Sequence, residues 1–587
     1  MTVRNVPGLE QALADWQACG KTRRLWNREA TLWTGQDEAR WLGWLDVVER
    51  ELENASTLKQ FAAEVRETGF EHALLLGMGG SSLCADVLAS VFGHTMGFPR
   101  LRVLDSIDPM QVHRVASEID PARTLFIVSS KSGTTLESSL LAEFFLDDLK
   151  RRLGDGNAGA QFVVVTDPGT PLQQLAEKEK FRRVFGGIPS IGGRFSALSN
   201  FGLVPAAAMG LDVRRLLRNA SRMVNLCRDE ASPETNPGVL LGLALGVAAE
   251  RKRDKVTLVT SPGLGRLELW IEQLLAESTG KNGKGLIPVC GEPVGWPEHY
   301  GNDRVFCYLR DRAAPQPSQN EAVEKLEATG HPVIQIEVGD VYDLGQEFFR
   351  WEFATAVAAS VLGVNPFDQP DVEAAKAAAR ECLKGLTSKK PALQPTPAVQ
   401  VDEVKLLDPH GDAMKAGEPV TSTEALRTAL RLHLEQLRPG DFFAVLAFVE
   451  MNEVHERILQ GIRIAVRDAF KVATMAGFGP RYLHSTGQLF KGGSNRGVLL
   501  IITSEEEVDV QARGQAHSFA AVKQAQAEGD LRIMSQRGRR ILRLHVGPDV
   551  TTGLGRIASE ILTTLERLSP RNTRTNNFTN ERTSHES

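Results

Sequence analysis

A recurring local pattern limits how this chain can fold: a short apolar strand, then a loop of glycine and hydroxyl residues, then a helix. The first example has a strand over 73–76 and a loop over 77–82, and the second has a strand over 124–128 and a loop over 129–135. Fully apolar strands that alternate with helices are typical of parallel sheets covered on both faces. The pattern therefore predicts an α/β protein built from doubly wound parallel sheets.

Both loops place backbone amides at a helix N-terminus, where they can bind an anion. The loop over 77–82 lacks the lysine of a nucleotide P-loop, and Ser82 stands where the dinucleotide fingerprint has its third glycine. Helix capping by Thr134 or Thr135 is the alternative explanation of the second loop, but a cap needs only one hydroxyl. Several hydroxyls beside a glycine indicate a phosphate monoester on a small molecule instead.

The segment 267–281 predicts a helix with one buried face, because its apolar residues recur at the i, i+3, i+4, i+7 spacing. Glu277 falls at the edge of the apolar stripe, and Gln273 lies one turn before it. Glu268 and Glu272 fall on another face. A partly desolvated carboxylate is a stronger base near neutral pH. Glu277 is therefore a candidate general base, with a solvated helix-end glutamate as the alternative.

Two further charged residues are candidates. Arg194 follows a glycine pair and leads into a hydrophobic run. Such a poorly solvated charge needs a partner, either a structural carboxylate or an anion that forms during a reaction. Lys376 lies two helical turns after Gln369 on one predicted face, and a solvated surface lysine is its alternative interpretation.

The composition argues against several classes of protein. The 587 residues suffice for two to four domains, and the net charge of −5 is too mild to suggest a nucleic-acid partner. The six cysteines are scattered, which indicates neither a zinc site nor a disulfide framework. We see no signal peptide and no apolar run of membrane-spanning length, so we expect a cytoplasmic protein without a membrane partner.

The predicted organisation has a polar linker near 385–405, marked by several prolines, and a Trp-rich N-terminus. The predicted parts are an N-terminal helical segment (1–60), a first α/β domain (61–211), a second (212–395), a smaller C-terminal α/β region (415–568) with strands near 442–448 and 498–503, and a disordered tail (569–587).

Five motifs in order carry a resemblance to a known family. They are GMGGSS at 77–82, SKSGTT at 130–135, GGRFS at 192–196, QLLAESTGK at 273–281 and FDQPDVEAAK at 367–376. Together they resemble the glucose-6-phosphate isomerases, which are built from two sugar-isomerase (SIS) domains. The stretches 30–34 and 482–488 resemble a narrower branch, the isomerase half of bacterial transaldolase–isomerase fusions.

The resemblance implies interconversion of glucose 6-phosphate and fructose 6-phosphate through a cis-enediol, without a metal or cofactor. It implies that Glu277 is the general base, that Arg194 stabilises the enediolate and that Lys376 assists ring opening. The residues implied to bind the sugar phosphate are Ser81, Ser130, Ser132, Thr135, Gln273 and Gln369.

The sequence departs from the family pattern at two places. Asp371 replaces the usual glycine of one motif. The family's ring-opening histidine, which reaches the partner subunit's site, has no clear match: the nearest alignment gives Arg304, with His299 close by and His484 a more distant candidate. We favour His299, because it lies in the segment where the family places its histidine. A homodimer is the expected assembly, but the argument for a shared site stays open.

Two other functions remain open from the sequence. One is a non-catalytic SIS protein that senses a sugar phosphate, which would need none of the three catalytic candidates. The other is a dual phosphoglucose/phosphomannose isomerase, since tolerance of the C2 epimer depends on pocket shape.

Overall fold

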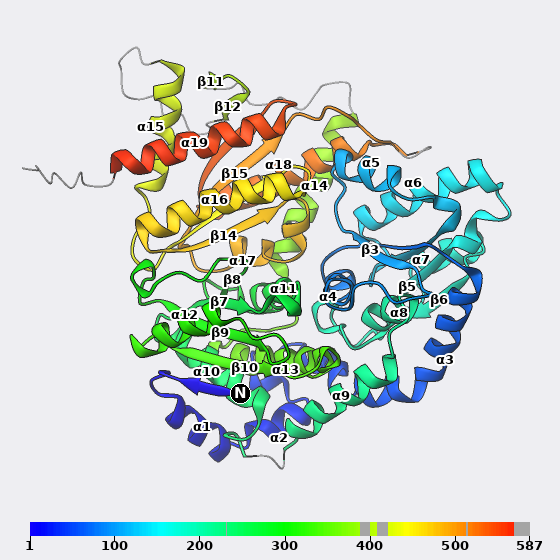
Figure 1. The fold of residues 1–587 in the computed structure, drawn as a ribbon, viewed down its shortest axis with the longest axis horizontal. Helices are drawn as coiled ribbons and strands as arrows, with labels where there is room; N and C mark the ends of the chain where they lie inside the picture. Colours follow the sequence, from blue (N-terminus) through cyan, green and yellow to red (C-terminus); the bar gives the residue numbers. More distant parts are fainter. Residues whose placement is uncertain (230–231, 388–398, 408–420, 512–514, 569–587) are drawn as a thin grey trace, which may run out of the picture.

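The computed structural model describes residues 1–229, 232–387, 399–407, 421–511 and 515–568. These residues form three β-sheets, each flanked by helices and drawn mainly from one stretch of the chain (Figure 1). The predicted α/β class is confirmed. The three sheets belong to the first domain, the second domain and the C-terminal region.

The first domain contains a parallel sheet with strand order β3-β2-β4-β5-β6. The chain passes from β2 to β3 on one side and then returns to β4 on the other, so the loops after β2 and β4 diverge at this switch point. The strands and helices are β2 (His72–Gly77), β3 (Arg100–Leu104), β4 (Thr124–Ser129), β5 (Phe162–Thr166), β6 (Arg183–Gly186), α3 (Val47–Thr68), α4 (Leu83–Phe92), α5 (Pro109–Ser117), α6 (Leu136–Leu153), α7 (Pro171–Lys178), α8 (Asn200–Ala208) and α9 (Val213–Leu226).

The second domain has strand order β1-β10-β9-β7-β8, in which β7 to β10 are parallel. The long helix α13 passes through the core and is buried along most of its length. The elements are β7 (Lys255–Thr260), β8 (Ile287–Val289), β9 (Arg304–Asp311), β10 (Val333–Val338), α10 (Pro237–Glu250), α11 (Leu267–Thr279), α12 (Pro317–Ala328), α13 (Leu344–Leu362) and α14 (Pro370–Thr387).

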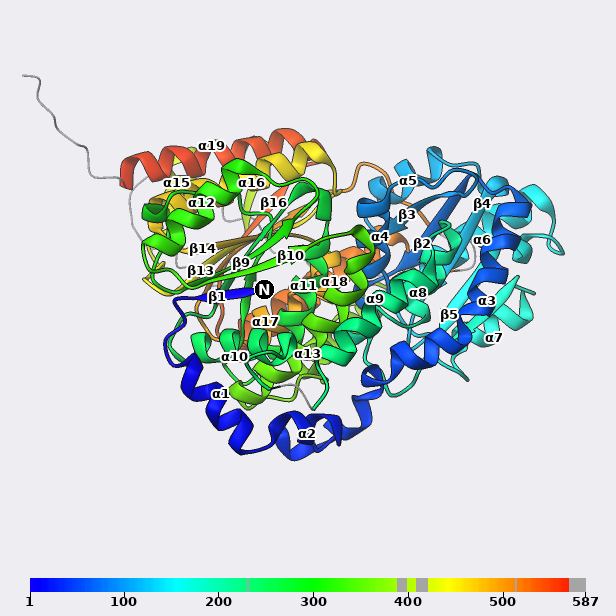
Figure 2. The same ribbon diagram turned by 60° about the horizontal axis from the view of Figure 1, so that its bottom comes forward.

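The N-terminal segment joins the two domains. It is mostly helical, with α1 (Leu9–Ala18) and α2 (Lys21–Trp26), but β1 (Thr2–Arg4) pairs antiparallel with β10 at the sheet edge (Figure 2). Trp44 packs against Phe195 of the first domain and Phe349 of α13, with ring centroids 5.4 Å and 5.8 Å apart. The tryptophans therefore bind the segment to both domains.

The C-terminal region has a mixed sheet with order β11-β12-β16-β15-β13-β14, in which β13 to β16 are parallel. Both predicted strands are present, as β13 and β15. The elements are β11 (Val399–Val401), β12 (Val404–Leu407), β13 (Phe442–Phe448), β14 (Ala473–Phe478), β15 (Gly497–Ser504), β16 (Arg540–Val546), α15 (Ser422–Leu434), α16 (Glu453–Phe470), α17 (Gly487–Gly492), α18 (Phe519–Gln536) and α19 (Val550–Leu568).

The linker prediction for 385–405 is partly wrong. Helix α14 continues to Thr387, and β11 and the start of β12 lie within the predicted linker, because their alternating residues pair with each other and with β16. Residues 388–398 lie outside the described residues. So do 415–420 of the predicted C-terminal region and the predicted tail, 569–587.

Buried ion pairs fasten the C-terminal region to the first domain. Arg481 contacts Asp105 at 2.6 Å and Asp86 at 2.8 Å, and Lys523 contacts Asp108 at 2.5 Å. Removing one member of such a pair leaves an uncompensated buried charge, which costs about 3–5 kcal/mol. The C-terminal region is therefore held rigidly against the first domain.

One buried carboxylate gives a stability prediction outside the site. Glu51 of α3 is 3% exposed, and burial raises its pKa to about 7. Because the folded-state pKa is raised, protonation stabilises the fold below about pH 4.5, and that stabilisation is lost as the pH rises through 7. Glu51→Gln should therefore raise stability at pH 8 by roughly 3 kcal/mol but leave it nearly unchanged at pH 4.5. Denaturant unfolding at both pH values tests this, and equal effects at the two values would contradict it.

Candidate active site

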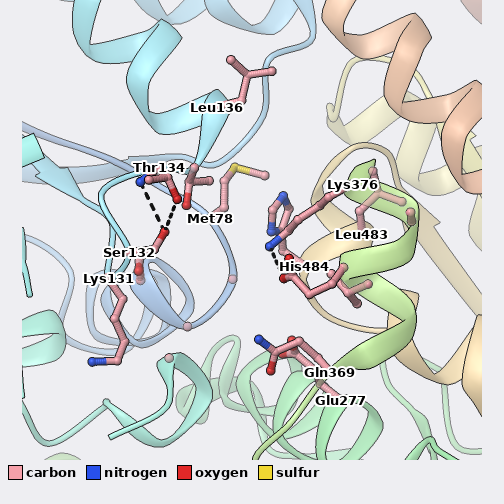
Figure 3. A pocket seen from close by; sticks show the side chains of 18 of the residues that line it. Met78, Lys131, Ser132, Thr134, Leu136, Glu277, Gln369, Lys376, Leu483 and His484 are labelled. Atoms are coloured by element: carbon pink, nitrogen blue, oxygen red, sulfur yellow. Dashed lines mark hydrogen bonds and ion pairs between the residues drawn. The ribbon is translucent and has the colours of Figure 1, made fainter. Parts of the chain in front are cut away.

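A cavity of about 1050 Å³ opens at the switch point of the first domain. The loops after β2 and β4 form one wall, α11 and the start of α14 form a second, and Leu483 and His484 of the C-terminal region form a third (Figure 3). The volume lies at the upper end of the usual range for small-molecule sites. All three regions therefore contribute to one site.

Most of the predicted site residues meet at this cavity. Ser130 lies just behind the wall, where its hydroxyl donates to the Thr135 hydroxyl at 3.1 Å. His299 lies outside the cavity, and its Nδ1 is 3.8 Å from a carboxylate oxygen of Asp468. The predicted residues that line the cavity are Ser81, Ser132, Thr135, Arg194, Gln273, Glu277, Gln369 and Lys376.

Glu277 lies at the inner end of the cavity, on the last turn of α11. The residue is 8% exposed. Its Oε2 accepts a hydrogen bond from the Gln273 side chain at 2.9 Å, and its Oε1 lies 3.6 Å from a guanidinium nitrogen of Arg194. A carboxylate with this burial and these two partners has a fixed orientation towards the cavity.

The other two carboxylates of α11 do not line the cavity. The face of α11 that carries Glu268 and Glu272 is covered as well, because the C-terminal region packs against it. Burial raises the pKa of Glu272 to about 7 and also raises the pKa of Glu268, although Arg463 opposes both shifts. Glu277 is thus the α11 carboxylate that the cavity reaches.

Gln273 carries an acceptor that the protein leaves unused. Its side-chain nitrogen donates to Glu277 and to the backbone oxygen of His484, both at 2.9 Å, which fixes the orientation of the amide. Its side-chain oxygen is buried and has no hydrogen-bond partner among the described residues. An unsatisfied buried acceptor is costly unless a ligand supplies a donor. A sugar hydroxyl in the cavity would supply one.

Arg194 is buried, at 3% exposed, and is held by several hydrogen bonds. Its Nε donates to the Ser278 hydroxyl at 2.8 Å, Nη1 to the Gln369 side-chain oxygen at 2.9 Å and Nη2 to the Asp368 backbone oxygen at 3.0 Å. Burial lowers the pKa of its guanidinium, while the Glu277 charge opposes that shift. Arg194 therefore contacts oxygens that fix its position and also the candidate base Glu277.

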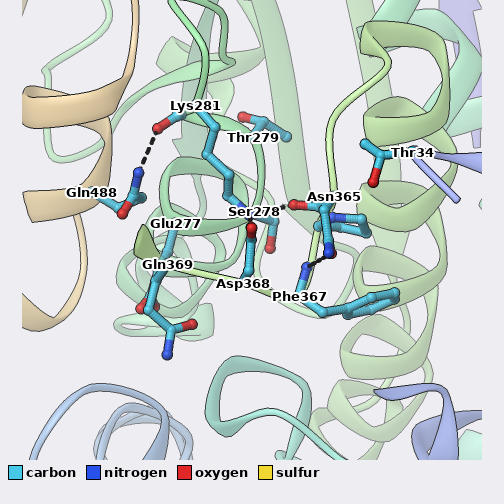
Figure 4. Close-up of polar contacts among 12 residues, drawn as sticks. Thr34, Glu277, Ser278, Thr279, Lys281, Asn365, Phe367, Asp368, Gln369 and Gln488 are labelled. Carbon is cyan, nitrogen blue, oxygen red and sulfur yellow. Dashed lines mark hydrogen bonds and ion pairs between the residues drawn. The ribbon is translucent and has the colours of Figure 1, made fainter. Parts of the chain in front are cut away.

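The loop that carries Gln369 is held by Lys281 (Figure 4). The Lys281 ammonium contacts an Asp368 carboxylate oxygen at 2.6 Å and the Asn365 backbone oxygen. Burial lowers the pKa of Lys281 to about 7, and the nearby Arg194 charge lowers it further while Asp368 opposes. Arg194 and Lys281 together fix this loop against the end of α11.

The hydroxyl loop at the start of α6 is arranged for an anion. Thr135 is the N-cap residue, but its side chain makes no capping hydrogen bond, so capping does not account for it. The Ser132 and Thr134 hydroxyls lie 2.9 Å apart, and the Thr134 amide donates to Ser132. The uncapped N-terminus leaves backbone donors and the positive end of the helix dipole available to a phosphate.

Two of the lysines that line the cavity, Lys131 and Lys376, differ in how they are held. Lys131 is bound by both Asp167 carboxylate oxygens, at 2.7 Å and 2.8 Å, which holds it away from a ligand. Lys376 lies on α14 at the cavity wall, with a side chain that is 43% exposed and contacts Glu373 at 2.9 Å. Of these two, only Lys376 can reorient towards a substrate.

Glycine is required where two loops meet. A Cβ at Gly80 would lie 2.1 Å from the backbone oxygen of Gly193. The GMGGSS and GGRFS loops are thus in direct backbone contact, which a larger residue would prevent.

The structure explains both departures from the family pattern. The Asp371 carboxylate accepts hydrogen bonds from Gln488 at 2.7 Å and from Arg537 at 2.5 Å, so it attaches α14 to the C-terminal region. Arg304 is fully buried on β9, where it pairs with Glu292 and lies outside the cavity.

Glu137 is a cavity residue that sequence reasoning missed. It lies in the first turn of α6, is 3% exposed and contacts the His484 Nε2 at 2.7 Å. Burial alone would raise its pKa, but the His484 contact outweighs that effect and brings the pKa down to about 2. Only the position of the C-terminal region brings these two residues together, so no local pattern in the sequence could have indicated the pair.

The described residues contain neither a metal-binding cluster nor a membrane-spanning helix. No group of three or more His, Cys, Asp or Glu side chains among them could hold a metal ion. None of their helices is both long enough and apolar enough to cross a bilayer.

Comparisons with known proteins agree with this geometry. A family model described as "Phosphoglucose isomerase" matches residues 45–287. A glucose-6-phosphate isomerase of Rubrobacter xylanophilus is 32% identical over 378 residues, which cover 56% of this chain and 86% of that protein. A probable glucose-6-phosphate isomerase of Methanococcus maripaludis is 29% identical over 386 residues, covering 58% and 84%.

Solved structures agree as well. A hypothetical protein of Thermus thermophilus superposes with a TM-score of 0.58 at 27% identity, covering 65% of this chain and 99% of that one. A glucose-6-phosphate isomerase of Chlamydia trachomatis has a TM-score of 0.50 at 21% identity, covering 61% and 76%, and so shares the fold.

The fold and the site define an α/β enzyme in which two doubly wound domains and the C-terminal region line one cavity. The chain belongs to the glucose-6-phosphate isomerase family.

Proposed function

We propose that the protein interconverts glucose 6-phosphate and fructose 6-phosphate through a cis-enediol. The observation that carries this proposal is the placement of Glu277, a buried carboxylate that lines the cavity and is held by Gln273 and Arg194. Aldose–ketose isomerisation needs one base that moves a proton between neighbouring carbons, and one fixed positive charge for the oxyanion.

In this mechanism the phosphate binds at the N-terminus of α6, against Ser132 and Thr135. Glu277 takes the proton from C2 of glucose 6-phosphate and delivers a proton to C1, and the proton on Glu277 exchanges in part with solvent between these steps. Arg194 stabilises the charge that develops on the enediolate oxygens, and it needs little rearrangement because its contacts already fix it. Gln273 and Gln369 bind sugar hydroxyls, and Lys376 assists opening of the ring.

A coupled assay of fructose 6-phosphate and of mannose 6-phosphate tests the proposal. Formation of glucose 6-phosphate from fructose 6-phosphate supports it. Turnover of both substrates would give the dual phosphoglucose/phosphomannose isomerase instead. Binding of fructose 6-phosphate without turnover would favour the alternative function, a non-catalytic protein that senses a sugar phosphate.

Two substitutions in the hydroxyl loop should separate binding from chemistry. Ser132→Ala with Thr135→Ala should raise the KM for fructose 6-phosphate by about tenfold or more for each lost bond, while kcat falls much less. Each lost charge-assisted hydrogen bond is worth roughly 1.5–3 kcal/mol. Steady-state kinetics measure both constants. Equal binding of fructose and fructose 6-phosphate by the unaltered protein would show that this loop does not bind phosphate.

We also propose a cytoplasmic location and a homodimeric assembly, which rest on the family resemblance. Light scattering on the purified chain measures the second directly, and a mass near 64.2 kDa would indicate a monomer.

A further inference from the structure

The C-terminal region inserts a short segment into the cavity wall. The segment Arg481–His484 follows β14, and His484 points into the cavity beside Lys376 (Figure 3). The family model ends at residue 287, and the two relatives described above match only 56% and 58% of this chain. The family model does not include this contribution to the site.

We propose that His484, positioned by Glu137, is the acid–base group that opens the sugar ring, and that it acts in the same chain as Glu277. The proposal rests on the isomerase function proposed above and assigns its ring-opening step. It makes one chain sufficient for a complete site.

The first support is the geometry of His484. Its Nε2 lies 2.7 Å from a Glu137 carboxylate oxygen. Its hydrogen bonds to other described residues use Nε2 and the backbone oxygen and not Nδ1, and the partly buried ring lines the cavity. A carboxylate on one ring nitrogen fixes the tautomer and orientation of the imidazole, which leaves the other nitrogen to exchange protons with a ligand.

The second support is the precision with which this loop is held beside the base. The His484 backbone oxygen accepts the same Gln273 amide that binds Glu277, at 2.9 Å. Gly79 makes this approach possible, because its φ is +54° and a Cβ there would lie 2.6 Å from the His484 backbone oxygen. The base, its amide partner and the histidine loop thus form one connected unit.

The third support is the anchoring of the two residues Arg481 and Tyr482 that precede His484. Arg481 pairs with Asp86 and Asp105 of the first domain, and the Tyr482 hydroxyl donates to Asp530 at 2.8 Å. A catalytic side chain must be held within a fraction of an ångström by its surroundings. This segment meets that requirement, whereas a mobile surface loop would not.

His299 lacks the place at the cavity and the close carboxylate contact that His484 has, although its Nδ1 is also without a hydrogen-bond partner among the described residues. It lies outside the cavity, and its Nδ1 is 3.8 Å from Asp468. A role for His299 would require that a second copy of the chain bring it to the site, and the test below includes that outcome.

The ring-opening step balances without any further reactant. In cyclic fructose 6-phosphate the bond between C2 and the ring oxygen breaks, and protonated His484 gives its proton to that oxygen. The C2 hydroxyl loses its proton to water as the ketone forms. His484 then regains a proton from water, so the protonation of the protein is unchanged after the step.

The test compares two substrates. Fructose 6-phosphate is largely cyclic, but 5-deoxyfructose 6-phosphate has no free hydroxyl that can close a five- or six-membered ring and stays open. His484→Ala should lower turnover of fructose 6-phosphate by about 10²–10⁴-fold. It should change exchange of the C1 proton of the deoxy compound with D2O by less than about threefold. His299→Ala is the matched control and should change neither.

Three results would overturn the proposal. One is near-unaltered turnover of fructose 6-phosphate by His484→Ala. The second is equal loss on both substrates by a folded His484→Ala and by His484→Gln, which would make His484 structural. The third is selective loss in His299→Ala. If the unaltered protein does not isomerise fructose 6-phosphate at all, the proposed function fails first, and this is seen before any variant is made.

Two further measurements test the positioning role and the single-chain site. Glu137→Gln should lower kcat for fructose 6-phosphate but leave proton exchange of the deoxy compound unchanged. It should have no added effect in the His484→Ala background, because Glu137 acts through the His484 ring. A mixture of the Glu277→Gln and His484→Ala proteins, unfolded and refolded together, should regain no activity. Recovery in that mixture would show that the two residues serve one site from different chains.

Discussion

Glu277→Gln is expected to lower kcat for isomerisation by several orders of magnitude while leaving the fold and the binding of sugar phosphates nearly unchanged. Glutamine keeps the shape of the side chain and its one amide oxygen can still accept from Gln273, but it loses the charge that faces Arg194 and cannot accept the C2 proton. Steady-state kinetics give kcat, and calorimetric titration with fructose 6-phosphate gives the affinity.

Glu373→Gln is the matched control for that variant. Glu373 also lines the cavity, but it lies at the exposed end of α14, where it contacts Lys376. Its substitution should change kcat by less than about threefold, as expected of an exposed ion pair. Turnover near the unaltered level in a folded Glu277→Gln protein would remove Glu277 as the base.

The second largest effect is expected for Arg194→Lys. The charge is kept, but an ammonium cannot reproduce the planar fork that binds Ser278, Gln369 and the Asp368 carbonyl together. We expect kcat to fall by about 10²–10³-fold, the usual loss when one preorganised oxyanion donor is removed. The Lys charge still faces Glu277, so the protein should remain folded.

Arg380→Lys supplies the comparison for Arg194→Lys. Arg380 lines the same cavity from α14 but is exposed, so its substitution should have little effect on kcat. Thermal unfolding distinguishes a catalytic defect from a loss of structure. A kcat for Arg194→Lys within about threefold of the unaltered protein would contradict the role of Arg194 at the enediolate.

Local signals in the sequence predicted several of the residues that line the cavity. The strand–loop–helix units appear as β2 with α4 and β4 with α6, and the buried stripe over 267–281 appears as α11. These features depend on hydrophobic periodicity and loop chemistry within about fifteen residues, which a single sequence displays. Glu277 and the hydroxyl loop were found for that reason.

Features that depend on distant segments could not be predicted. The pairing of β1 with β10 joins residues more than three hundred positions apart. The contact between Glu137 and His484 likewise depends on the docking of the C-terminal region. Glu137 alone looks like an ordinary first-turn glutamate at a helix N-terminus, and His484 alone looks like a loop histidine.

Asp371 shows the same limit from another direction. In the sequence it is only a departure from a motif. In the structure the Asp371 carboxylate accepts hydrogen bonds from Gln488 and Arg537 of the C-terminal region. The aspartate at this position therefore serves the contact with that region. A local sequence pattern cannot reveal this contact, because the two partners are far apart in the sequence and meet only in the folded chain.

The most direct test of the central claim is to equilibrate fructose 6-phosphate with the protein in D2O and follow the sugar by NMR. Proton transfer by Glu277 through an enediol predicts glucose 6-phosphate with deuterium at C2 and recovered fructose 6-phosphate with one deuterium at C1. The Glu277→Gln protein should produce neither label. Formation of glucose 6-phosphate over many turnovers without deuterium, or no glucose 6-phosphate at all, would contradict the account.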